Sequence, residues 1–203
     1  SLKKIVFAVS TEGLTRRALA NYCYHEEQGF WVHSLGVAQT SRVLVEGSTL
    51  CRMSAEEAFV AGLLHDIGKL VINDFLPATE GRRVTRDMEV EAVGLDHSEL
   101  ADHILKQWNL PDSITACVRH HHDFRQAGEW DRGAAVLGLA EGICGHWGLG
   151  RQTPVDLSED VPAEKFQEAL AHLGLPLDKW DQVIWDIRQN LVGLDGIFRD
   201  YAD

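Results

Sequence analysis

The chain has 203 residues, of which 45% are hydrophobic and 25% are charged. This length can enclose a full hydrophobic core, and these fractions are close to those of ordinary globular proteins, which argues against a disordered, fibrous or repeat protein. The formal net charge of -12 argues against broad affinity for nucleic-acid phosphates or anionic membranes, because an acidic surface repels both. We therefore expect a globular protein that binds neither nucleic acid nor a membrane.

The sequence carries no sign of export or of membrane insertion. No stretch approaches the roughly 18 apolar residues that a membrane span requires, and residues 1–20 lack the long apolar region of a signal peptide. The four cysteines are far apart and form no Cys-x-x-Cys pair. This favours buried thiols in a reducing compartment over a disulfide framework or a zinc knuckle. The predicted location is the cytoplasm.

Helical periodicity dominates the first half of the chain. Apolar residues recur at helical spacing from residue 30 onward, and no alternating run of strand length lies between hairpin turns. After a looser helical segment over 2–24, we expect a helix over 30–46. The pattern from Ser54 to Glu57 is a capping box, and it predicts a helix that continues through AFVAGLLHDIGKLVI. The predicted fold class is all-α.

The same periodicity continues in the second half of the chain. Residues 73–88 contain Pro, Gly and several charges and are expected to form a loop. A helix is expected over 96–108, and Asp112 is expected to cap another helix that reaches His122. After a polar loop, an apolar helix is expected over 134–147. These helices complete the predicted core.

A helical tail follows the core. One tail helix is expected between Pro162 and Gly174, and a second over 177–201. We therefore divide the chain into a helical core, residues 1–148, and a C-terminal extension, residues 149–203, that packs on or beside the core. The tail shows no chemistry of its own, and it can dock on the core or mediate a homodimer.

Four polar residues occupy positions that the helical pattern assigns to the core. His33, Asp66, His121 and Glu141 each lie three, four or seven residues from apolar residues, so each should face the interior. A single histidine or acid in such a place is most often a hydrogen-bonded core residue. Several of them on different helices favour a common site, because buried charge must be compensated.

Imidazole and carboxylate groups together suit iron, manganese, zinc and related ions, and a shared ion offsets the cost of burying them. A site of this composition can hold two ions about 3.5 to 4 Å apart, with Asp66 as a bridge, and can generate a hydroxide that attacks phosphorus. The spacing by itself does not distinguish such a site from a hydrogen-bonded core.

The segment GLLHDIGKLVI at 62–72 closely resembles the central motif of the HD superfamily of metal-dependent phosphohydrolases. The surrounding order H…HD…H…HH…D/E also matches, through FWVHSLGVA, GLDHSELA, RHHHDF and LAEGIC. The segments WVHSLGVA, LDHSELA and WNLP are most similar to the HDOD branch, which comprises HD-related output domains of bacterial signalling proteins. The resemblance covers residues 1–148 well and the tail weakly. It implies a compact HD-type helical bundle with a helical tail.

The resemblance also implies two neighbouring metal positions that share one aspartate. The first would be held by His33, His65, Asp66 and Glu141, and the second by Asp66, His97, His121 and His122. Lys69 matches the HDxGK lysine, which would meet a substrate phosphate as a point charge; a solvated surface lysine is the alternative. The implied cofactors are divalent metal ions, iron or manganese above all, and the implied catalytic residues are Asp66 and Lys69.

The sequence departs from the family pattern in three places. Glu141 stands where an aspartate is usual, which lengthens that ligand by one methylene. The loop after His122 lacks a GYP signature, which disfavours the cyclic-di-GMP phosphodiesterase branch. HDOD domains also normally carry more helices before the region that starts here, so the resemblance leads us to expect a fragment or an abbreviated member. Arg82, Arg83 and Arg86 form a basic loop that can receive phosphate oxygens or face solvent.

Three functions are compatible with this pattern. The first is a bacterial HDOD-type signal-transduction domain with a mononuclear or dinuclear His/Asp metal site and a signalling protein, a phosphorylated small molecule or a nucleotide as its partner. The second is an active metal-dependent phosphohydrolase or phosphodiesterase. The third and weakest is a di-iron oxygenase. The sequence favours the signalling domain and leaves open whether the protein is an enzyme.

Overall fold

The computed structural model describes residues 19–24, 29–77, 84–151 and 156–192, and all structural statements below concern these residues. Their regular structure is helical, apart from one isolated antiparallel bridge between Tyr24 and Arg151. The all-α prediction is confirmed for this part of the chain. None of the helices in it is both long and apolar enough to cross a membrane. In chain order the elements are η1 (Ala20–Tyr22), α2 (Gly29–Gly47), α3 (Ala55–Leu64), α4 (Ile67–Ile72), α5 (Arg86–Val93), α6 (His97–Gln107), α7 (Asp112–Arg119), η2 (Phe124–Gln126), η3 (Gly128–Trp130), α8 (Asp131–His146), η4 (Ala163–Phe166), α9 (Gln167–Leu173), η5 (Leu177–Lys179) and α10 (Trp180–Leu191).

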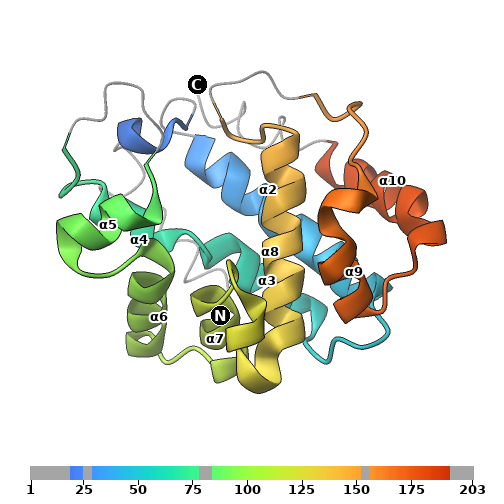
Figure 1. Cartoon of the computed structure of the whole chain (residues 1–203), viewed down its shortest axis with the longest axis horizontal. Helices are drawn as coiled ribbons and strands as arrows, with labels where there is room; N and C mark the ends of the chain where they lie inside the picture. The colour runs from blue at the N-terminus through green and yellow to red at the C-terminus, as the bar shows by residue number, and fades with distance from the viewer. Residues whose placement is uncertain (1–18, 25–28, 78–83, 152–155, 193–203) are drawn as a thin grey trace.

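Helix α8 is the central element of the fold (Figure 1). It packs against α2, α3 and α7 of the core and against α9 of the tail. Its sequence explains this position, because most of its residues are small or apolar and nine of its sixteen residues are buried. Helices α4 to α6 lie on one side of α8 and the tail helices α9 and α10 lie on the other.

The expected helix after Ser54 is interrupted. Its start is confirmed, because the Ser54 hydroxyl accepts a hydrogen bond from the backbone of Glu57 and the Glu57 carboxylate accepts one from the backbone of Ser54. The helix ends at Leu64, however, and a turn at His65 and Asp66 separates α3 from α4. In an unbroken helix the Gly62 carbonyl would accept from the backbone of Asp66, whereas here it accepts from the His65 imidazole at 2.8 Å.

The break directs α4 toward α6. At Gly68, an added Cβ would lie 2.1 Å from the carbonyl oxygen of His97, so the two segments approach each other as closely as only glycine allows. The expected loop over 73–88 gives way to α5, which begins at Arg86 with the Thr85 hydroxyl as its cap. Helix α6 begins as expected, with Asp96 accepting hydrogen bonds from the next turn.

Helix α7 differs from its prediction at both ends. Its N-cap is Pro111, and Asp112 is its first residue, so the expectation that Asp112 caps the helix is wrong. The helix ends at Arg119, so it does not reach His122. Adjacent residues on a helix point about 100° apart. His121 and His122 lie beyond the end of α7, so this restriction does not apply to them.

The tail packs on the core. Pro162 precedes η4, and helix α9 ends at Leu173 with Gly174 as its C-cap, whose φ of 65° is as expected for a glycine cap. Helix α10 packs against α2, and the Trp180 indole donates a hydrogen bond to the Val161 carbonyl at 2.7 Å. The second tail helix covers Trp180–Leu191, the first three residues of its predicted range form η5, and residues 193–201 lie outside the described residues. Most of the segment predicted over 2–24 also lies outside them.

Candidate metal centre

Seven predicted site residues converge from five segments of the chain. Their ligand atoms form two groups, and within each group the atoms lie within 4.8 Å of one another. The first group contains His33 on α2, His65 and Asp66 in the turn before α4, and Glu141 on α8. The second contains His97 at the start of α6, and His121 and His122 in the turn after α7.

The carboxylate of Asp66 lies between the two groups. Its Oδ2 atom is 3.3 Å from His65 Nε2 and 3.9 Å from His33 Nε2. Its Oδ1 atom is 3.4 Å from His97 Nε2, in the other group. The side chain is fully buried. A carboxylate that bridges two ions would need one oxygen on each side, which is the arrangement found for Asp66.

The four buried imidazoles are oriented in the same way. In each ring the Nδ1 atom faces an oxygen atom that can only accept a hydrogen bond, so Nδ1 carries the proton and Nε2 carries the lone pair. All four Nε2 atoms therefore offer lone pairs to the centre of the cluster. The acceptors are the Leu149 carbonyl for His33 at 3.3 Å, the Gly62 carbonyl for His65 at 2.8 Å, the Glu89 carboxylate for His97 at 2.7 Å and the Val118 carbonyl for His121 at 2.6 Å.

Several of these inward-facing atoms lack a hydrogen-bond partner. The Nε2 atoms of His33, His65 and His121 and the Oδ1 atom of Asp66 are buried without one. Leaving a polar atom in this condition costs about 1–3 kcal/mol, and several such atoms in one place are unusual in a folded protein. A cation between them would accept all of these lone pairs at once. The donor set, imidazole nitrogen and carboxylate oxygen, fits a divalent ion.

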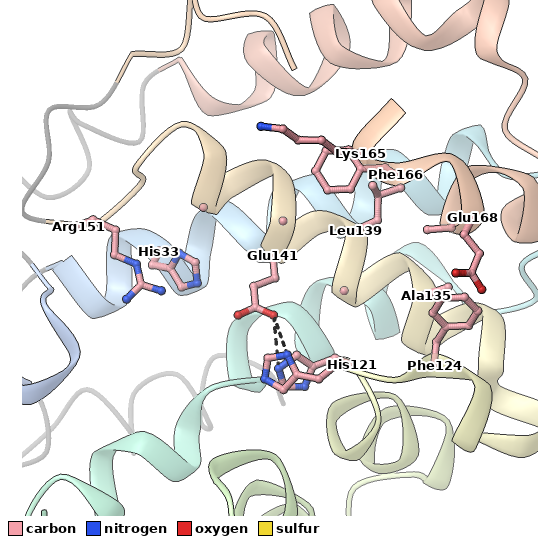
Figure 2. A pocket seen from close by; sticks show the side chains of 15 residues that line it. His33, His121, Phe124, Ala135, Leu139, Glu141, Arg151, Lys165, Phe166 and Glu168 are labelled. Atoms are coloured by element: carbon pink, nitrogen blue, oxygen red, sulfur yellow. Dashed lines mark ion pairs between the residues drawn. The ribbon is translucent and has the colours of Figure 1, made fainter. Parts of the chain in front are cut away.

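Glu141 reaches the same centre from α8. Its Oε2 atom lies 3.6 Å from His121 Nε2 and 3.5 Å from His122 Nδ1, as the dashed lines in Figure 2 show. The His122 Nε2 atom is 2.9 Å from His97 Nε2, close to the separation of about 3 Å between neighbouring ligands that bind one ion at about 2.1 Å. The carboxylate of Glu141, which stands where the family pattern has an aspartate, thus belongs to the first group and also lies close to two histidines of the second.

The end of α7 explains how two consecutive histidines face one centre. His121 and His122 lie in a turn rather than on the helix, and their ring centroids are 3.9 Å apart. The close approach of α8 supports this turn, because an added Cβ at Gly138 would lie 2.3 Å from the His121 carbonyl oxygen.

Burial keeps most of these imidazoles neutral. It lowers the pKa of His33 to about 3 and that of His122 to about 4, with additional repulsion from nearby cationic groups, and it also lowers the pKa of His121 well below its usual value. For Asp66, burial alone would raise the pKa, but His65 and Lys69 hold it well below the usual range. His33, His121 and His122 are therefore neutral and Asp66 is ionised at neutral pH, which are the protonation states that bind metal ions, whereas Asp66 raises the pKa of His65.

Lys69 is buried beside Asp66. Its ammonium donates a hydrogen bond to Asp66 Oδ2 at 2.5 Å and lies over the ring of Tyr22, 5.6 Å from its centroid. Only 6% of the residue is exposed, so it is not a solvated surface lysine. In this structure its ammonium forms an ion pair with Asp66. The predicted contact with a substrate phosphate stays a prediction.

The sequence analysis missed three supporting residues. Glu89 on α5 binds His97 through both the imidazole and the backbone nitrogen, the latter at 2.8 Å. Tyr22 donates its hydroxyl to Glu89 at 2.9 Å, and Tyr24 donates to Asp66 Oδ2 at 2.9 Å. The only sequence feature that pointed to any of the three was the position of Glu89, eight residues before the motif histidine His97.

Two cavities adjoin the cluster. One, the α8 cavity, has a volume of about 580 Å³ and extends from His121 along α8 to Lys165 and Phe166 of the tail (Figure 2). The other, the α5 cavity, measures about 350 Å³ and is lined by Lys69 and Arg86 among others. Three residues line both cavities: His122, Glu141 and Arg151.

The basic loop predicted near the site is only partly described. Arg86 faces the α5 cavity, with Nη1 3.8 Å from a carboxylate oxygen of Asp96. Arg82 and Arg83 lie outside the described residues. In the tail, the presence of Lys165 and Phe166 in the α8 cavity shows that this part of the chain also contributes to the surroundings of the cluster.

The chain is similar to solved structures of the same fold. An HDOD domain protein of unknown function from Geobacter sulfurreducens shares 23% identity at a TM-score of 0.59, over 86% of this chain and 65% of that one. A protein from Marinobacter aquaeolei VT8, described as a signal transduction protein, shares 18% at a TM-score of 0.65, over 92% of this chain and 41% of that one. A protein from Shewanella amazonensis SB2B, described as a phosphohydrolase, shares 20% at a TM-score of 0.66, over 94% of this chain and 67% of that one. The chain thus spans less than two thirds of the first two structures.

No curated protein matches the chain significantly. The model of the HDOD domain family matches residues 1–124, which contain six of the seven candidate ligands. The sequence-based assignment is confirmed by this match. The chain belongs to the HDOD domain family, and it carries a histidine and carboxylate cluster of the composition that binds divalent metal ions.

Proposed function

We propose that this chain is a signal-transduction module whose fold is organised around a dinuclear metal site. His33, His65, Asp66 and Glu141 would hold one ion, and Asp66, His97, His121 and His122 the other. The observation that carries the proposal is the convergence of buried Nε2 and Oδ1 atoms that lack hydrogen-bond partners. In a core held by hydrogen bonds, each imidazole nitrogen would donate a proton to the carboxylate oxygen that it faces. Here the imidazole nitrogens direct lone pairs at carboxylate oxygens 3.3–3.9 Å away.

We propose iron or manganese as the resident metal. The first group combines imidazole and carboxylate ligands, the second consists of three imidazoles that Asp66 Oδ1 would complete, and neither includes a thiolate. This mixture suits iron and manganese, whereas structural zinc sites usually include cysteine. When bound, such ions supply Lewis acidity that can polarise a phosphoryl oxygen.

The direct test is elemental analysis of protein purified without a metal-binding tag. We expect about two metal ions per chain in the parent and a loss of metal in His65→Ala and Asp66→Ala. His103→Ala is the matched control, because His103 is an exposed residue of α6 outside the cluster. Equal metal content in the parent and both cluster variants, or a parent without metal after growth in iron and manganese, would contradict the proposal.

An active phosphohydrolase or phosphodiesterase is the second candidate. The two cavities that adjoin the cluster favour it, because they give a ligand access to His122 and Glu141 beside basic side chains. In this function Asp66 would hold both ions and Lys69 would contact the phosphate. Hydrolysis of a phosphoester that disappears in Asp66→Ala with the fold intact would support it, and equal rates in both proteins would exclude this site as its source. Dioxygen consumption by an iron-loaded protein would instead favour the weakest candidate, the oxygenase.

We propose a cytoplasmic setting and a protein or phosphorylated small molecule as the partner. The four cysteines are free thiols, which suits a reducing compartment. The tail presents the exposed side chains of Leu177 and Trp185, and this surface is where a signalling partner or a second copy of the chain would bind. Sedimentation analysis of the parent and Trp185→Ser tests the homodimer, since a monomeric parent excludes it.

A further inference from the structure

Arg151 lies beside the cluster, outside the part of the chain that the family model matches. It lines both cavities, together with His122 and Glu141. Figure 2 shows its guanidinium next to the ring of His33, on the side of the cluster. A cation in this place faces the route by which a ligand would reach the cluster from either cavity.

The guanidinium is held in place by two contacts. Its Nη1 donates a hydrogen bond to the backbone carbonyl of Tyr22 at 3.0 Å, and the group stacks on the ring of Tyr24, 4.4 Å from the centroid. The bridge between Tyr24 and Arg151 adds a backbone restraint. A side chain that is already held loses little conformational entropy when it binds a ligand.

The segment that carries Arg151 is packed tightly against α2. Gly150 has a φ of 71°, and an added Cβ there would lie 2.0 Å from the carbonyl oxygen of Gly29. The preceding residue, Leu149, supplies the carbonyl that orients His33. The same short segment therefore orients one candidate ligand and positions the arginine, so the place of Arg151 relative to the cluster is fixed by the backbone.

The guanidinium of Arg151 has no ion-pair partner among the described residues. Within this part of the chain, the only hydrogen bond of its guanidinium is the one to the Tyr22 carbonyl. The other basic groups of the α5 cavity are paired: Lys69 with Asp66, and Arg86 with Asp96. A half-buried arginine without a carboxylate partner is costly unless a ligand supplies the negative charge.

From this placement we propose that Arg151 binds the anionic end of the ligand of this site, a phosphate-type oxyanion. The planar guanidinium presents several donors in a fixed geometry, which suits two oxygens of one phosphate. This inference rests on the proposed metal site, since ions in the cluster would bind the remaining oxygens. It assigns a ligand-binding role to a residue of the C-terminal extension.

The test is calorimetric titration of the metal-loaded chain with inorganic phosphate and, separately, with phenylphosphonate as a mimic of a phosphomonoester. We expect Arg151→Gln to weaken anion binding about tenfold or more, as the loss of a charge-assisted hydrogen bond predicts, with unchanged metal content. Arg151→Lys should bind with intermediate affinity. Tighter binding of phenylphosphonate would identify an organic phosphate as the ligand, and tighter binding of inorganic phosphate would identify the free anion. Either result supports the proposal if the binding depends on Arg151.

Arg42→Gln is the matched control, because Arg42 is an exposed arginine of α2 that pairs with Glu46 on the surface. It should bind both anions as the parent does. Equal affinities in the parent and Arg151→Gln, or an equal loss in Arg42→Gln, would overturn the inference while leaving the metal site intact. If the parent holds no metal, the proposed function fails, and the same titration on metal-free protein still decides the role of Arg151 by whether the two proteins differ.

Discussion

The imidazole of His97 is held by Glu89, whose Oε2 atom lies 2.7 Å from Nδ1 and also accepts the backbone N–H of His97 at 2.8 Å. Tyr22 donates its hydroxyl to the other carboxylate oxygen of Glu89. A carboxylate in this place fixes the tautomer of a metal-binding histidine and raises its basicity. Helix α5 therefore contributes to the cluster without providing a ligand, although the sequence analysis placed its first three residues in a loop and left the others unassigned.

Glu89→Gln should weaken metal binding about 10- to 100-fold, because the neutral amide no longer stabilises the tautomer that directs Nε2 at the cluster. Competition with a chromogenic chelator measures the effect. Glu91→Gln is the control, since Glu91 is an exposed residue of the same helix. If both variants retain the affinity of the parent, Glu89 has no influence on the metal site.

Tyr24→Phe should destabilise the metal-free protein by about 1–3 kcal/mol. The change removes the hydrogen bond that the hydroxyl donates to Asp66 Oδ2 and leaves a buried carboxylate with one partner fewer. Urea unfolding in the presence of a chelator measures the difference. A loss below about 0.5 kcal/mol would show that the ammonium of Lys69 alone satisfies this oxygen.

Two glycines should respond oppositely to substitution by alanine. Gly68→Ala should unfold the protein or cost several kcal/mol, because its Cβ would lie 2.1 Å from the His97 carbonyl oxygen and would separate α4 from α6. Gly145→Ala should be neutral or stabilise by about 0.5–1 kcal/mol, because Gly145 is on α8 with no atom within 4 Å of its Cβ position. Thermal unfolding of both variants checks this pair, and equal stabilities would contradict it.

The sequence predicted the composition of the cluster better than the backbone that carries it. The periodicity placed His33, Asp66 and Glu141 on inward faces, because the apolar neighbours of each define a buried stripe. The same periodicity wrongly extended one helix through Asp66 and another to His122. A helix that ends because a side chain hydrogen-bonds to the preceding turn shows no change in its apolar pattern. His65 and the turn at His121 are both of this kind.

The supporting residues could not be predicted from the sequence for a different reason. Tyr24 and Arg151 reach the cluster through contacts between segments that are distant in sequence, and no local spacing encodes such contacts. Glu89 lies only eight residues before His97, but on a helix that the sequence analysis did not predict.

Acid should destabilise the metal-free protein well above the pH at which exposed carboxylates titrate. Burial lowers the pKa of His33 to about 3 and that of His122 to about 4, against an ordinary value near 6.5. Between these values the unfolded chain binds protons that the folded chain does not, so the free energy of unfolding falls as pH decreases. His65 has a raised pKa and acts in the opposite direction, because Asp66 outweighs the effect of burial on it. Urea unfolding in a chelator at pH 7.5, 6 and 5 should show a decline below pH 6.5, and a flat profile would contradict it.

Two of the four thiols should be inert in the folded protein. Burial raises the pKa of Cys117 and of Cys144 to about 12, so almost no thiolate forms at neutral pH, and neither side chain is accessible. Cys23 and Cys51 are half-buried, and Cys51 also has a raised pKa, so a thiol reagent should label Cys23 first and Cys51 more slowly. Mass spectrometry of peptides after labelling in native buffer and in urea separates the four positions. Because Cys144 lies on α8, three residues after Glu141, with its Sγ 3.5 Å from the Thr40 hydroxyl of α2, rapid native labelling at this position would show that α8 separates from α2, and with it that the site we propose binds metal opens.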